Sequence, residues 1–247
     1  MKRILKPVYL PPVVLGFAII AYIARTFLFA AAIGADEGAF LPVGSWSDVL
    51  SWIMVAATVV ICGLGVLNLQ NKNNYAYNFP RSNLAAIGML LAGLGFCITA
   101  FVDLLAGTDS VGFASAILGF PAAISLWILA YGRTKGRRFP LVFHGIICLY
   151  LMLHLVSHYR LWSSYPQLQS YAFELLAIVF VMLAAYHRAA FDADQGKCRA
   201  YTFFTLVGLF FCVATLPGCD NPAFFLGCAA WMYFTPCKLI QPSRKED

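Results

Sequence analysis

The sequence predicts an all-α fold: a polytopic bundle of about eight transmembrane helices with both termini on the cytoplasmic side. Composition is the first reason. Of the 247 residues, 61% are hydrophobic and 11% are charged, and the mean hydropathy is +0.77. A soluble domain carries about 25% charged residues. The apolar side chains must therefore face lipid as well as each other.

The second reason is the length of the apolar runs, because about 20 residues cross a bilayer core about 30 Å thick. In chain order the runs are Val8–Ala32, Ser47–Leu69, Asn83–Ala106, Ser110–Tyr131, Pro140–Tyr159, Leu168–His187, Tyr201–Pro217 and Pro222–Ile240. The last two are short and flank a Pro-Gly-Cys-Asp-Asn-Pro turn. They predict a hairpin of two spans, and two re-entrant segments are the alternative.

The third reason is the distribution of basic residues, which gather in alternate gaps between the runs. The gaps assigned to the cytoplasm hold Lys2, Arg3, Lys6, Lys72, Arg81, Arg133, Lys135, Arg137, Arg138, Arg188, Lys197, Arg199, Lys238, Arg244 and Lys245. The outer gaps hold Arg160 and are otherwise acidic, with Asp36, Glu37, Asp48, Asp109 and Asp220. An error of one span would destroy this alternation, so the basic residues support the count of eight independently.

The chain is expected to form a single transmembrane domain over residues 1–247. Alternating long and short outer loops suit a weak duplication of four-helix halves, residues 1–132 and 133–247. The similarity of residues 93–97 to residues 208–212 points the same way, although shared membrane composition explains it better. Small residues four apart, such as Gly88 and Ala92, predict closely packed helices.

Four ionisable residues lie inside the predicted spans, where a charge is costly unless it meets a partner or water. They are Arg25, Asp103, His154 and Glu174, and His158 lies one turn beyond His154. At a rise of about 1.5 Å per residue, all of them fall within roughly 10 Å of the outer helix ends. One interpretation is an outward-facing polar pocket that binds a substrate or ion, with Arg25 balanced by Asp103 or Glu174. The other is a structural ion pair with side chains that reach the headgroups.

Several familiar chemistries are absent from the sequence. It has no Walker A loop, no H-E-x-x-H and no G-x-S-x-G, and its eight cysteines form no C-x-x-C pair. No metal site, haem or other cofactor is expected. Cys219 alone falls in an outer loop, and a disulfide from it to Cys212 or Cys228 stays open.

The expected partners follow from the surface. The bilayer itself covers the apolar faces, and the basic run Arg133, Lys135, Arg137 and Arg138 is suited to anionic lipid headgroups. A protein partner or a second copy of the chain is allowed. Nucleic acid is not expected, because no basic face alternates with stacking aromatics.

Three function classes remain. The polar residues near the outer end and the helix count favour a small-solute transporter or permease-like protein. The scarcity of deep charges favours a non-catalytic membrane subunit, sensor or scaffold. An intramembrane enzyme using His154, Glu174 or Asp103 is the weakest, because no catalytic spacing is evident, so an enzyme is not expected. The first apolar run is longer than the roughly 7–15 residues of a signal core, so we expect it to be an uncleaved first helix. Short loops and the absence of a cleaved signal suggest a bacterial plasma membrane.

Overall fold

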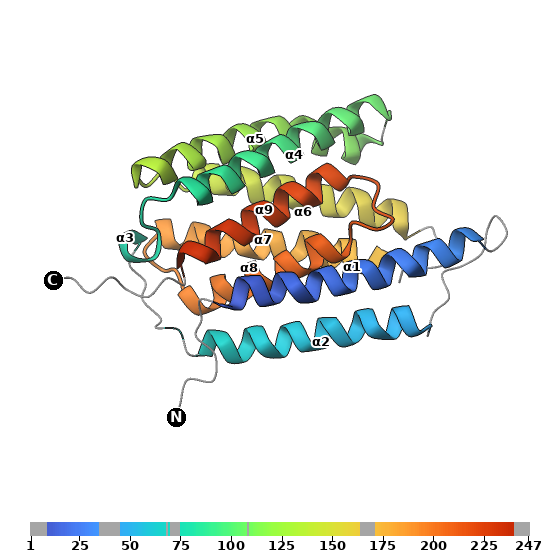
Figure 1. The fold of residues 1–247 in the computed structure, drawn as a ribbon. Coiled ribbons are helices and arrows are strands. Elements are labelled where there is room, and N and C mark those ends of the chain that lie inside the picture. The colour runs from blue at the N-terminus through green and yellow to red at the C-terminus, as the bar shows by residue number, and fades with distance from the viewer. Residues whose placement is uncertain are drawn as a thin grey trace.

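The computed structural model describes residues 9–34, 45–67, 69, 75–107, 109–163 and 171–239, and within them all regular secondary structure is helical. This confirms the all-α prediction. Figure 1 shows the bundle, whose helices are α1 (Leu10–Gly34), α2 (Trp46–Leu67), α3 (Tyr75–Asn78), α4 (Asn83–Leu105), α5 (Ser110–Lys135), α6 (Val142–Trp162), α7 (Ala172–Asp192), α8 (Cys198–Ala214) and α9 (Pro222–Leu239).

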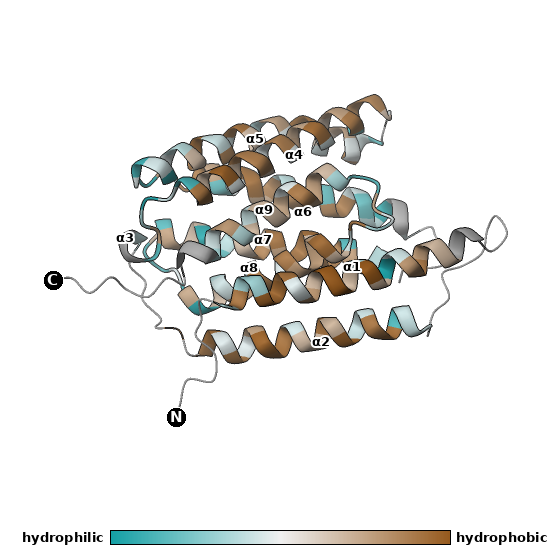
Figure 2. Ribbon diagram, in the orientation of Figure 1, coloured by the Kyte–Doolittle hydropathy of each residue, from teal (hydrophilic) through white to brown (hydrophobic). Residues whose placement is uncertain are grey.

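Six of these helices, α1, α2, α4, α5, α6 and α7, are long and apolar enough to cross a membrane. The remaining long helices, α8 and α9, have 17 and 18 residues. Both run antiparallel within the same bundle, which is roughly consistent with the predicted count of about eight. Figure 2 shows hydrophobic colour along most of the helices and hydrophilic colour mainly toward their ends. The chain therefore has the architecture of a multi-pass membrane protein.

We name the two ends of the bundle after the predicted orientation. The outer end carries the α4–α5 and α8–α9 loops, and the inner end is where α1 begins and α9 ends (Figure 1). The predicted span ends Val8, Leu168 and Ile240 lie outside the described residues. So do eight charged residues used in the orientation argument: Lys2, Arg3, Lys6, Asp36, Glu37, Lys72, Arg244 and Lys245.

Helix α8 lies at the centre of one half of the bundle, where it contacts α1, α2, α7 and α9. Its buried residues occur on every side, from Cys198 through Leu206 and Phe211 to Ala214. A helix that is apolar all round belongs in such a central position. The short length of α8 is therefore accommodated by neighbouring protein and not by lipid alone.

Helix α4 packs against α9 at glycines, as the small-residue spacing predicts for Gly88. A Cβ atom on Gly88 would lie 2.8 Å from the Ala230 carbonyl oxygen, and one on Gly95 would lie 2.6 Å from that of Ala223. Larger side chains would thus separate the two backbones. The contact at Gly95 also places the first turn of α9 beside the second half of α4, so that α4 extends beyond it to Leu105. The loop that precedes α9 therefore lies near the last turns of α4.

Two helices extend further toward the inner end than the apolar runs predict. Helix α5 continues past Tyr131 to Lys135 and ends at Gly136, whose φ of 67° is in the left-handed region. Helix α7 continues past His187 to Asp192. The sequence assigned Arg133 and Arg188 to loops, and this placement is wrong. Both lie inside helices and are buried, at 1% and 2% exposure.

Candidate functional site

Three of the predicted site residues meet between α4 and α6 near the outer end. His154 Nδ1 lies 4.0 Å from Asp103 Oδ2, and the His154 side chain is 2% exposed while that of Asp103 is 15% exposed. The His158 ring centroid lies 4.0 Å from that of His154, and His158 Nδ1 lies 3.0 Å from the His154 carbonyl oxygen. These groups form a titratable cluster that runs from a partly exposed carboxylate to a buried imidazole.

The cluster continues inward along α6. Tyr150 lies one turn below His154, with ring centroids 5.6 Å apart, and its buried hydroxyl has no hydrogen-bond partner among the described residues. Phe224 of α9 contacts the other side of His154, at 4.8 Å between centroids. His158, His154 and Tyr150 recur every four residues, so they lie on one face of α6. They form a file of protic side chains directed from the outer end into the bundle.

The other two predicted residues form a second cluster between α1 and α7. Arg25 and Glu174 are each 4% exposed, and Glu174 and Asp48 lie within electrostatic range of the Arg25 guanidinium. The Arg25 Cζ atom is 4.1 Å from the Phe173 ring centroid and 5.3 Å from that of Phe29. An aromatic face and nearby carboxylates thus offset this buried cation. Of the two carboxylates that the sequence offered as partners of Arg25, Asp103 and Glu174, the one that lies near it is Glu174.

The loop between α8 and α9 touches both clusters. Asn221 is a hydrogen-bond partner of the Asp103 carboxyl group, and Asp220 lies within electrostatic range of Glu174. All five predicted residues are therefore gathered around one loop, but as two clusters and not as a single pocket. The sequence indicated their depth; the loop that connects them could not be recognised from the spacing.

Cys219 lies in the same loop, outside the spanning helices. Its thiol donates to the Leu216 carbonyl oxygen at 3.2 Å, and it forms no disulfide with Cys212 or Cys228. Burial raises the pKa of this thiol to about 12, and the negative charge of Glu174 adds to the effect. The loop thus holds a protonated thiol within electrostatic range of the Glu174 carboxylate.

Sequence reasoning missed a second group of buried ionisable residues, at the inner end. Arg133 and Arg188 lie there together with His144, whose Nδ1 is 3.2 Å from Asp192 Oδ2. A signal was available, since both arginines continue the buried faces of their helices. Leu126, Leu129, Ala130 and Arg133 follow helical spacing on α5, as do Val181, Ala184 and Arg188 on α7.

The rest of the basic run differs from Arg133. Lys135 and Arg137 are exposed, and Arg138 is 40% exposed and paired with Asp194 at 2.8 Å. These residues remain available to headgroups. Arg133 is not at the surface, because its side chain is enclosed by protein.

Two grooves open sideways between helices. One of about 480 Å³ lies between α6 and α7, lined by Cys148, Leu149, Met152, Met182, Leu183 and Tyr186. The other, of about 350 Å³, lies between α1 and α2. Both linings are almost wholly apolar, which suits lipid chains or the side chains of another membrane helix.

Within the described residues, no group of three or more His, Cys, Asp or Glu is arranged to hold a metal ion.

Comparison with known proteins finds no matching family model, no matching curated protein and no matching solved structure. Arguments about function therefore rest on the geometry of this chain.

Proposed function

We propose that this multi-pass protein is a small-solute transporter of the permease type, located in a bacterial plasma membrane, whose outward-facing site binds and releases a proton. Asp103 and His154 are the proton-binding groups. His158 links them to the outside, and Tyr150 extends the file inward. Arg25 and Glu174 attract or orient a charged solute at the same loop.

The observation that carries this proposal is the 4.0 Å approach of His154 Nδ1 to Asp103 Oδ2 inside the bundle. A small side-chain rotation closes that distance to a hydrogen bond, so one proton can be shared by the pair. Intramembrane carboxylate and histidine pairs are suited to proton relays, because each change of protonation changes the charge in a poorly solvated site. The 15% exposure of Asp103 supplies contact with the outer solution.

A non-catalytic membrane subunit or scaffold is the second candidate. The two open grooves favour it, because their apolar linings fit another membrane helix better than a polar solute. A transporter in an outward-open state would instead show a polar opening, and these grooves do not provide one.

The test is transport by purified protein in liposomes that contain a pH-sensitive dye. Labelled amino acids, sugars, nucleosides and small organic acids are added one at a time, and uptake and internal pH are recorded together. We expect at least one solute to enter with a proton. Asp103→Asn should lower that uptake to the level of empty liposomes, and His154→Gln should shift its pH dependence.

The matched control is Asp109→Asn at the same end. Asp109 is an exposed carboxylate paired with Arg160 at 3.0 Å, and it caps α5 through Gly112, a role that Asn also fulfils. This variant should transport normally. If no solute of the panel enters with the wild-type protein, or if both Asp variants behave alike, the proposal fails and the subunit role is favoured.

A further inference from the structure

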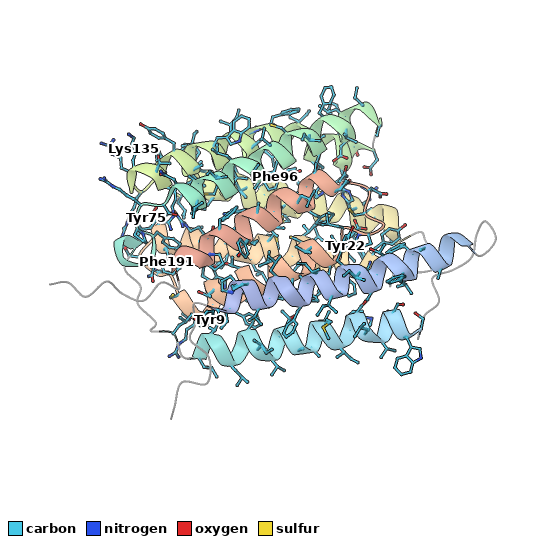
Figure 3. The ribbon with its side chains drawn as sticks, viewed as in Figure 1. Tyr9, Tyr22, Tyr75, Phe96, Lys135 and Phe191 are labelled. Carbon is cyan, nitrogen blue, oxygen red and sulfur yellow. The ribbon has the colours of Figure 1, made fainter. Side chains whose placement is uncertain are left out.

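The inner end holds two buried arginines that share one aromatic ring. Arg188 Cζ lies 3.7 Å from the Phe79 ring centroid, and Arg133 Cζ lies 5.0 Å from it. Tyr75, Phe79, Phe191, Cys198 and Tyr201 form the hydrophobic cluster around them. Figure 3 shows Tyr75 and Phe191 at the inner end, with Lys135 at the rim of the bundle. Two cations from α5 and α7 thus meet in a site enclosed by aromatic side chains.

The hydrogen-bonding groups of these arginines are only partly used. Arg133 Nη1 donates to the Pro80 carbonyl oxygen at 2.7 Å, and Arg188 Nη2 donates to the Tyr75 hydroxyl at 3.1 Å. Tyr201 is a further hydrogen-bond partner of Arg188. Nε and Nη2 of Arg133 and Nε and Nη1 of Arg188 are buried and have no partner among the described residues. Buried donors on charged groups are costly to leave unpaired, and an aromatic face does not satisfy them.

The local charge is also unbalanced. Arg133 and Arg188 lie within electrostatic range of each other, so they repel. Asp192 is within electrostatic range of Arg188, so one carboxylate faces two guanidinium groups. The nearby Asp194 is already paired with Arg138. The described residues around the two arginines therefore leave an excess of positive charge.

We propose that Arg133 and Arg188 form a binding site for a phosphate group, supplied either by a free phosphate ion or by the headgroup of an anionic phospholipid. A phosphate carries several acceptor oxygens, and the two guanidinium groups beside Phe79 have four buried nitrogens without a partner among the described residues. Tyr75 and Tyr201 supply hydroxyl groups beside them. The negative charge balances two cations that the protein otherwise leaves in repulsion.

An exposed arginine at the inner surface lies close to this site. Arg138 is 40% exposed, and its Cζ lies 4.9 Å from the Tyr75 ring centroid. Tyr75 in turn contacts Arg188, through the hydroxyl and with Arg188 Cζ 5.3 Å from the ring centroid. Tyr75 thus lies between an exposed arginine and a buried one, and an anion attracted to Arg138 would reach Arg188 once the Tyr75 side chain moves aside. The inference does not depend on transport at the outer end.

The experiment measures thermal unfolding of the purified full-length protein in two settings. In an uncharged, phosphate-free detergent, sodium phosphate is compared with sodium chloride at equal ionic strength. In lipid nanodiscs, phosphatidylglycerol is compared with phosphatidylcholine. A ligand at about ten times its dissociation constant should raise the melting temperature by about 3–6 °C in a protein of this size. A rise with phosphate identifies a free ion, and a rise only in phosphatidylglycerol identifies the lipid headgroup.

Three variants locate the effect. Arg133→Gln and Arg188→Gln should each abolish the rise. Arg137→Gln removes an exposed charge from the same end and should retain it. If the rise persists in both buried-site variants, or is equally reduced in Arg137→Gln, the proposal is overturned in favour of general surface attraction. If neither phosphate nor phosphatidylglycerol stabilises the wild-type protein, the pair has a structural role only.

One further measurement covers variants that do not fold. Native mass spectrometry of the wild-type protein should retain one phosphate or one phosphatidylglycerol per chain, and Arg188→Lys should lose it because an ammonium group lacks the paired donors. A wild-type protein that carries neither adduct contradicts the site.

Discussion

The two ends of the bundle treat buried charge in opposite ways. At the outer end each ionisable group lies near one of opposite or complementary character: Arg25 near Glu174, and Asp103 near His154. At the inner end two like charges, Arg133 and Arg188, lie against the same ring, Phe79. The outer end is therefore compensated from within the chain. The inner end is compensated only in part, since four of its guanidinium nitrogens have no partner among the described residues.

This difference decides what each end is suited to do. An Asp–His pair can gain or lose a proton, and each such change alters its net charge by one, which suits a proton-binding site. An excess of fixed positive charge cannot titrate at physiological pH, because guanidinium groups stay protonated. It is suited to binding an anion. Three measurements test whether the contrast is real.

The largest expected effect comes from removing the buried carboxylate at the outer end. Glu174→Leu leaves the buried Arg25 guanidinium without its α7 carboxylate, and we expect a loss of about 3 kcal/mol in the free energy of unfolding. The double variant Arg25→Met, Glu174→Leu should recover most of this loss. Urea titration in phosphate-free detergent measures all of these variants.

Arg133→Met is the matched change at the inner end. It removes one of two repelling cations together with two unpartnered donors, so its effect should lie between no change and a gain of about 1 kcal/mol. A loss as large as that of Glu174→Leu would mean that both ends are stabilised in the same way, and the contrast would be lost.

An intermediate effect is expected in the reactivity of Cys219. Because its pKa is raised to about 12 by burial, with a further contribution from Glu174, little thiolate is present at pH 8. Iodoacetamide should modify it on the order of tens of times more slowly than the same cysteine in the denatured chain, allowing for the higher nucleophilicity of a more basic thiolate. Peptide mass spectrometry follows the rate.

Glu174→Gln should accelerate this reaction severalfold, because it removes a negative charge near the thiol. Arg133→Gln, at the other end, should leave the rate unchanged. Equal acceleration in the two variants would show general loosening of the bundle and not a local electrostatic effect.

The smallest effect concerns the exposed pair at the inner end. Arg138 donates to both carboxylate oxygens of Asp194, at 3.0 and 2.8 Å, and these hydrogen bonds lower the pKa of Asp194 below its usual value of 3.8. The folded chain therefore binds this proton less readily than the unfolded chain. The stabilisation is present above pH 3.8 and is lost as the pH falls through the lowered pKa.

When the pH falls from 5 to 3, the melting temperature of Asp194→Asn should therefore decrease less than that of the wild-type protein. The difference should be small and should shrink in 1 M salt, because both side chains are exposed to solvent. A difference that does not respond to salt would mean that Asp194 acts through packing.

Much of the fold could be predicted from local properties of the sequence. The start of α4 at Asn83, of α5 at Ser110 and of α9 at Pro222 matches the predicted starts, because turn and capping residues stand beside long apolar runs. The inner ends of α5 and α7 could not be placed in this way. A charged residue ends an apolar run in the sequence, but it does not have to end the helix. At Arg133 and Arg188 the neighbouring protein continues to cover the helix, and the helix continues with it.

The candidate site shows the same division. Depth along a helix follows from residue counting, which is why Arg25, Asp103, His154, His158 and Glu174 could be placed near the same end of the bundle. Partners do not follow from counting. Asp103 meets His154 from 51 positions away because α4 and α6 both pack against α5, and the α8–α9 loop reaches both clusters.

The sequence by itself determined the helices, their order and the gathering of ionisable residues, because hydropathy and turn propensity act over short distances along the chain. Only the tertiary structure decided which charges share an environment. Arg133 and Arg188 are far apart in sequence, and both come to lie against Phe79, the residue that follows α3. Electrostatic energy depends on the distance between charges and on their exposure to water, and both are set by packing.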